Sequence, residues 1–167
     1  MLTIATSLQQ LDFGKLMAVY EEGNRENGAE FYPNLMEGQQ LLEAEQDFYH
    51  YLRTAFFTNS GDRYCIWQEN GIYLSALRLQ SYQDGLLLEA LETHPQYRKQ
   101  GYAKKLIRAA LEMVECDKVY VHISRRNASS IAVHTACGFR KILDHSVYAD
   151  GSVNSHCATY LYEKPTL

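Results

Sequence analysis

A cluster of basic residues surrounds a single glycine in the middle of the chain. Five cations and no carboxylate lie between Arg98 and Arg108, although the 167-residue chain has a net charge of −4. An apolar run, Leu86–Leu91, precedes the cluster, and a helical pattern begins near Tyr102. A strand, a short loop and a helix N-terminus offer an anion free N–H groups and positive potential, and Gly101 leaves the backbone accessible. The sequence therefore predicts a phosphate-binding loop.

The loop pattern narrows the choice of phosphate ligand. It has neither the Gly-Lys-Ser/Thr ending of a Walker A loop nor the three glycines of a dinucleotide site. Its pattern, Arg98-x-x-Gly101-x-Ala103, resembles the acetyl-CoA pyrophosphate loop of the GNAT N-acetyltransferase superfamily. A second pattern, Asn-x-x-Ser-x-x-x-His-x-x-x-Gly-Phe from Asn127 to Phe139, resembles the second signature of that family. The two patterns occur in the family order, and the resemblance runs from about Tyr64 to the C-terminus.

Length and composition limit the class of protein. At 167 residues, with 46% apolar and 22% charged residues, the chain resembles an ordinary single globular domain, residues 1–167. No apolar run reaches the ~20 residues that span a bilayer. The isoelectric point near 5.8 argues against a nucleic-acid binder. The four cysteines lack the spacing of a metal site, and no secretory signal is evident, so we expect a cytoplasmic protein without metal.

Apolar periodicity and turn residues predict the elements that position the loop. A strand near Leu2–Thr6 should come first. We expect a helix over Ser7–Asn24 capped by Ser7 and a helix over Gln39–Phe57. Between them, Gly23, Gly28 and Pro33 break the helical pattern, so Glu21–Glu37 should be a long loop or a frayed helix end. The remaining elements follow in this order: strands Tyr64–Gln68, Ile72–Tyr82 and Leu86–His94, a helix from Tyr102, strand Lys118–Ser124, helix Ala128–Cys137, and a hairpin of Phe139–Tyr148 with Asn154–Tyr162.

This element order is that of the GNAT family. The resemblance implies a mixed α/β fold: a mostly antiparallel sheet of about seven strands and about four helices, with strands four and five diverging to admit acetyl-CoA. It also implies a set of residues that hold the cofactor. These are Leu91, Glu92 and Thr93, whose backbone would pair with the pantetheine, the loop residues Arg98, Lys99, Gln100, Gly101, Tyr102, Ala103 and Lys104, and Asn127.

Glu89 is the first candidate for a catalytic base, because it is a carboxylate inside an apolar strand. Burial would raise its pKa toward neutrality, which suits proton abstraction. Its position nine residues before Arg98 resembles that of the catalytic Glu in polyamine-type members of the family. Glu92 is the alternative, and strand alternation predicts that it points to the opposite face. A base recruited elsewhere, or water, also remains open.

His134 stands where the family has a Tyr that protonates the departing CoA thiolate. A histidine, with an ordinary pKa of about 6.5, is a possible donor of that proton. A packed histidine that only shapes the pocket is an equally good interpretation. Asn127 likewise has two interpretations, since it is also the expected cap of the helix that follows.

The resemblance implies transfer of an acetyl group from acetyl-CoA to a primary amine of a small molecule or peptide, by direct attack on the thioester. The acidic run Glu21–Glu30 would then lie near the acceptor, or would be a solvated surface. The alternative function is a non-catalytic acyl-CoA sensor. The protein should be a monomer or a homodimer, and a homodimer would use the last strand, expected at or near a sheet edge.

Overall fold

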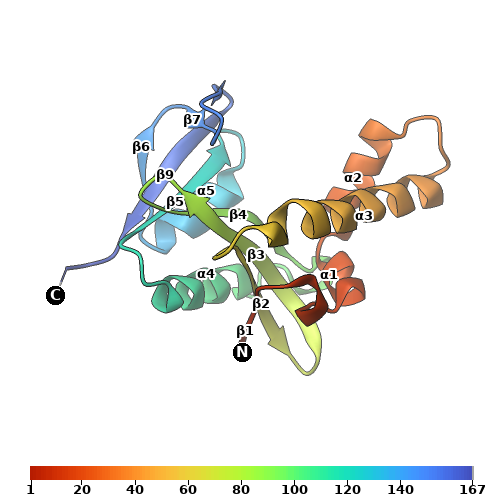
Figure 1. Cartoon of the computed structure of the whole chain (residues 1–167), viewed down its shortest axis with the longest axis horizontal. Coiled ribbons are helices and arrows are strands. Elements are labelled where there is room, and N and C mark those ends of the chain that lie inside the picture. Colours follow the sequence, from red (N-terminus) through yellow and green to blue (C-terminus); the bar gives the residue numbers. More distant parts are fainter. Residues whose placement is uncertain (167) are drawn as a thin grey trace.

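The computed structural model describes residues 1–166, which form a mixed α/β fold around one large sheet (Figure 1). The strand order is β1-β2-β3-β4-β5-β9-β6, and only β4 and β5 are parallel neighbours. The strands of this sheet are β1 (Leu2–Ala5), β2 (Arg63–Glu69), β3 (Ile72–Tyr82), β4 (Gly85–Thr93), β5 (Lys118–Ser124), β6 (Arg140–Leu143) and β9 (Cys157–Glu163). Two short strands, β7 (Ser146–Val147) and β8 (Val153–Asn154), pair separately. The predicted fold class is confirmed.

Five α-helices and three short 3₁₀ turns accompany the strands in the described residues. They are α1 (Phe13–Val19), α2 (Glu21–Phe31), α3 (Glu37–Thr54), α4 (Tyr102–Met113) and α5 (Ala128–Ala136), with η1 (Leu8–Gln10), η2 (Phe56–Thr58) and η3 (Pro95–Tyr97). In Figure 1, α2 and α3 run side by side and project beyond the sheet. None of the described helices is both long and apolar enough to cross a membrane.

The two faces of the sheet carry separate hydrophobic cores. Cys65 packs with the apolar stripe of α4, while its neighbours Tyr64 and Ile66 pack with α1 and α3. Because successive side chains of a strand point to opposite faces, α4 and α3 cover opposite faces of the sheet. The apolar stripe of α4 that the sequence predicted faces the core: Leu106 and Ile107 are completely buried, and only Ala103 at the start of the stripe is partly exposed.

The N-terminal third differs from the sequence prediction. The helix expected from Ser7 begins at Phe13 instead, and Asp12 caps it by accepting a hydrogen bond from the N–H of Lys15 at 3.1 Å. The segment expected to be a loop forms α2. Its Gly28 is a point of close approach, because a Cβ there would lie 2.4 Å from a backbone oxygen of α3. A residue that suggested a helix break is therefore a helix–helix contact.

The predicted divergence of β4 and β5 is present. Their pairing is limited to Leu86–Leu88 on β4 and Val119–Val121 on β5. Beyond Leu88, β4 continues to Thr93 without a partner on that side in the described residues. This gap opens at the end of β4 that leads into the phosphate loop.

The C-terminal strand, expected at or near a sheet edge, lies next to the edge strand and not at the edge itself. Strand β9 lies between β5 and β6 and pairs with both, so β6 forms the edge instead. Since β9 is paired on both sides, it offers no free edge to a second copy, and the oligomeric state stays a prediction.

Candidate active site

The loop before α4 has the backbone expected of an anion site. Lys99 has φ 61° and Gly101 has φ 82°, so two residues of the loop are left-handed. A Cβ on Gly101 would meet no atom within 4 Å, which means that its outer side is open. Left-handed residues in a loop gather successive N–H groups into an anion-binding concavity, and the α4 dipole adds to it. The loop therefore fits a pyrophosphate.

The predicted cofactor residues are brought together. A cleft of about 550 Å³ runs from the end of β4 to the start of α4, and every predicted cofactor residue except Gln100 lines it. Three residues of α5 also line it: Ser130, which belongs to the second sequence pattern, and Ser129 and Val133, which the sequence did not suggest. Asn127 both lines the cleft and caps α5, where its side chain accepts a hydrogen bond from the N–H of Ser130 at 3.0 Å.

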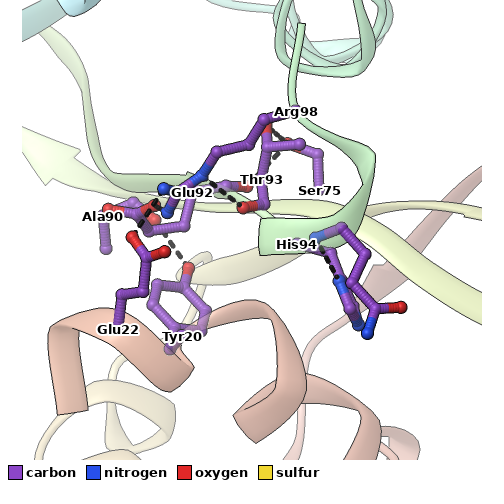
Figure 2. A network of polar contacts seen from close by, with 9 residues as sticks. Tyr20, Glu22, Ser75, Ala90, Glu92, Thr93, His94 and Arg98 are labelled. Atoms are coloured by element: carbon purple, nitrogen blue, oxygen red, sulfur yellow. Dashed lines mark hydrogen bonds and ion pairs between the residues drawn. The ribbon is translucent and has the colours of Figure 1, made fainter. Parts of the chain in front are cut away.

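Arg98 does not point freely into this cleft. One of its terminal nitrogens lies 2.5 Å from a carboxylate oxygen of Glu22, and the other lies 3.6 Å from one of Glu92 (Figure 2). Its charge is thus already balanced by α2 and β4. Lys99 and Lys104, which also line the cleft, form no ion pair within the described residues. The positive charge available to a phosphate comes from these lysines and from the helix terminus.

A bulge in β4 changes which side chains share a face. The ladder pairs Glu89 with Arg78 and then Glu92 with Ala76, and Ala90 between them has φ 51°. Arg78 and Ala76 are two residues apart on β3 and share a face, so Glu89 and Glu92 share it too. The expectation that the two glutamates point to opposite faces is wrong, because simple alternation fails at a bulge.

Glu89 lies in a second, larger cleft of about 1110 Å³, which borders the first at Leu91 and Ser130. Its carboxylate is 3.3 Å from Nε of Arg78, whose guanidinium stacks over the ring of Tyr51 at 4.8 Å. Burial raises the pKa of Glu89, Arg78 opposes that rise, and nearby Asp62 adds to it. The net pKa is raised, as a base acting near neutrality requires.

His134 lines the same larger cleft and is only 1% exposed. Its Nδ1 is 2.8 Å from the carbonyl oxygen of Ser130 and must donate, since a carbonyl only accepts. Its Nε2 is buried without a hydrogen-bond partner in the described residues, and burial lowers the pKa of the ring. A neutral imidazole with an unprotonated Nε2 is a poor source of protons, so this geometry favours the pocket-wall interpretation.

The larger cleft has polar walls that the sequence did not identify as one site. They come from three separate segments that meet only in the fold: Asp62 before β2, His122 on β5, and Tyr148 with Asp150 in the β7–β8 turn. The acidic run of α2 is elsewhere, and its Glu22 is committed to Arg98. No sequence spacing could have connected these residues. Among the described residues, no group of three or more potential ligands is arranged to hold a metal ion.

Known proteins share this fold. A search of curated proteins finds no match for the chain. Three solved structures share the fold at low identity. The PaiA N-acetyltransferase of Thermoplasma acidophilum in complex with coenzyme A has a TM-score of 0.63 and 13% identity, and the match covers 98% of this chain and 99% of that one.

The other two structures are bacterial enzymes. The Vibrio cholerae spermidine N-acetyltransferase in complex with CoA and spermine has a TM-score of 0.61 and 16% identity over 98% of this chain and 95% of that one. The Escherichia coli ribosomal-protein-S18-alanine N-acetyltransferase has a TM-score of 0.58 and 17% identity, and the match covers 100% of this chain and 96% of that one. The family model of the acetyltransferase (GNAT) family matches residues 24–139, which include most of α2 and the whole phosphate loop. The chain is therefore an acetyl-CoA-dependent acetyltransferase that belongs to the GNAT family.

Proposed function

We propose that the protein transfers the acetyl group of acetyl-CoA to a primary amine of a small molecule or peptide. One observation carries this proposal: the cleft that fits the cofactor and the cleft that holds Glu89 border one another at Leu91 and Ser130. A thioester that enters from the loop side and an amine that enters from the other side would meet there. The amine would then attack directly, without a covalent enzyme intermediate.

The residues around the cofactor cleft have the chemistry to hold acetyl-CoA. The N–H groups at the start of α4, with Lys99 and Lys104, would take the pyrophosphate. The unpaired backbone of Leu91–Thr93 would take the pantetheine as a neighbouring strand would. Bound there, the cofactor supplies an activated acetyl carbonyl.

Glu89 is the proposed base. An aliphatic amine is mostly an ammonium ion at neutral pH, and Glu89 removes one proton from it. The amine nitrogen then forms its bond to the acetyl carbon, the carbon–sulfur bond breaks, and the second amine proton passes to the thiolate. A backbone N–H near Leu91 stabilises the negative charge that develops on the carbonyl oxygen. Asp62 and Asp150 in the same cleft favour a cationic acceptor.

The chain would work as one domain, since strands from both of its ends, β1 and β9, belong to one sheet. Its four cysteines are free thiols, as expected in the reducing cytoplasm. It would be a monomer or a homodimer.

The alternative function is an acyl-CoA sensor, and the buried, neutral His134 in place of a family Tyr is the observation in its favour. Release of free thiol from acetyl-CoA, measured with a panel of di- and polyamines, amino acids and peptide N-termini, separates the two functions. We expect amine-dependent thiol release and an acetylated amine by mass spectrometry. Tight acetyl-CoA binding with no turnover on any amine class would support the sensor.

A further inference from the structure

Tyr20 makes a single, short contact with the bulge of β4. It lies at the junction of α1 and α2, is 6% exposed, and donates its hydroxyl to the carbonyl oxygen of Ala90 at 2.6 Å. Figure 2 shows the phenol rising from the helix toward Ala90. Its ring is fixed by Phe48 at 5.0 Å and Tyr64 at 6.4 Å between centroids. The hydroxyl is therefore held in place from behind.

The carbonyl that Tyr20 binds belongs to an unusual peptide. The β3 ladder pairs Glu89 and Glu92 but skips Ala90 and Leu91, and pairing with β5 has already ended before them. Ala90 has φ 51°, a left-handed conformation that is strained for a non-glycine residue. Neither strand neighbour fixes this peptide, so another contact must set its orientation.

Orientation of the carbonyl also sets the direction of an N–H group. The described chain has no cis peptide bond, and a trans peptide is planar with its C=O and N–H pointing in opposite directions. With the Ala90 carbonyl directed at Tyr20, the N–H of Leu91 points away from α1 and α2. Leu91 lines both the cofactor cleft and the cleft of Glu89.

We propose that Tyr20 is a positioning residue: by holding the Ala90 carbonyl, it aims the N–H of Leu91 at the carbonyl oxygen of the thioester. The inference rests on the proposed placement of the thioester at the junction of the two clefts. Tyr20 does not touch the reacting atoms and acts through the peptide between Ala90 and Leu91. An N–H fixed before the substrate arrives stabilises developing negative charge without reorganisation.

Two further observations fit this role. Burial raises the pKa of Tyr20 well above its usual value, so its hydroxyl remains a donor throughout the working pH range. Two residues later, Glu22 binds Arg98 of the phosphate loop. The start of α2 thus holds both the bulge of β4, through Tyr20, and the phosphate loop, through Glu22 (Figure 2). Both of these segments would contact the cofactor.

The test is Tyr20→Phe, which removes one oxygen and keeps the ring. Tyr73→Phe is the matched control, because Tyr73 is 5% exposed, packs in the same core and has a hydroxyl that accepts a hydrogen bond from the N–H of Asp12. Loss of an oxyanion donor typically lowers kcat about 100- to 1,000-fold, so loss of its aim should lower kcat about 10- to 100-fold. The KM for acetyl-CoA should stay within about threefold, and Tyr73→Phe should leave kcat unchanged.

A spectroscopic measurement reads the contact without turnover. Isotope-edited infrared difference spectra of bound acetyl-CoA with a ¹³C-labelled acetyl carbonyl report how strongly the carbonyl is polarised. We expect a shift to lower frequency on binding in the wild type and in Tyr73→Phe, and a smaller shift in Tyr20→Phe. An equal shift in all three proteins, together with equal kcat, would overturn the role of Tyr20 and leave the proposed placement of the thioester intact. No shift in the wild type would instead overturn the proposed placement of the thioester.

Discussion

The two sides of β4 are built in different ways. On the cofactor side, the site comes mainly from one continuous stretch, Leu91–Lys104, and its proposed contacts are backbone N–H groups. On the acceptor side, the walls come from segments far apart in the sequence, such as those of Asp62, His122 and Tyr148. A site made of local backbone can be recognised from a short pattern. A site made of distant side chains appears only when the chain is folded.

The largest effect is expected at Gly101, because the cofactor side needs the space that a side chain would fill there. Gly101→Val should weaken acetyl-CoA binding more than about 100-fold, because the new side chain would project from an open, left-handed position into the pyrophosphate site. Calorimetry measures the loss.

Gly71→Val is the control for backbone strain. Gly71 has φ 76°, is equally open, and lies in the β2–β3 turn away from both clefts. Both variants should lower the melting temperature by a similar amount, and only Gly101→Val should lose binding. Equal acetyl-CoA affinity in the two variants would contradict the assignment of the loop.

On the acceptor side, Glu89→Gln should lower kcat about 100-fold or more, the lower end of what a general base contributes. Glu92→Gln is the matched control, since Glu92 shares the face but is tied to Arg98. It should cost much less in kcat. If Glu92→Gln is the more damaging change, the base has been assigned to the wrong glutamate.

Arg78 sets the pH range in which Glu89 works. Burial raises the pKa of Glu89 and Arg78 lowers it, so Arg78→Met should raise that pKa further. Only ionised Glu89 accepts a proton, and the acid limb of kcat/KM should therefore move to higher pH. The other titratable neighbours of Glu89 remain in place in this variant: Tyr51, Asp62, and across the cleft His122 and His134.

The control for Arg78 is Arg140→Met. Arg140 lies on the distant edge strand β6 and pairs with Glu163 of β9. Its acid limb should match that of the wild type. A ¹³C-carboxyl NMR titration of Glu89 gives the same comparison without substrate. An unmoved or lowered Glu89 pKa in Arg78→Met would contradict the ion pair as the cause.

The smallest effect is expected at His134. Because its Nδ1 is committed to Ser130 and burial lowers its pKa, the ring should not supply the proton for the thiolate. His134→Phe should change kcat by less than about fivefold, within the range of a packing change. The alkaline limb of the pH profile should also stay in place. A large drop in kcat together with a displaced alkaline limb would restore the acid role.

The contrast between local signals and distant contacts also explains which elements could be predicted from the sequence. The helix from Tyr102, the strand Lys118–Ser124 and the capped helix after Asn127 have strong local signals, and the structure confirms them. The order of the last strands and the shared face of Glu89 and Glu92 were not predictable, because strand pairing and a bulge depend on distant partners.

The N-terminal third differs from the sequence prediction for a related reason. Gly23 and Gly28 suggested a loop, since glycine destabilises an isolated helix. In the fold, Gly28 allows α2 to pack closely against α3, and tertiary contact outweighs the local preference. The acidic run Glu21–Glu30 had two interpretations, a position near the acceptor or a solvated surface, and neither included the ion pair of Glu22 with the phosphate-loop arginine.

The most direct test of the account is a crystal structure of the protein soaked with acetyl-CoA. The pyrophosphate should accept hydrogen bonds from backbone N–H groups of residues 99–104, and the thioester oxygen should face the N–H of Leu91. The sulfur should lie at the junction of the two clefts, with Glu89 beyond it. A cofactor bound in the cleft between Arg108 and Lys164, at the other end of α4, would contradict the account.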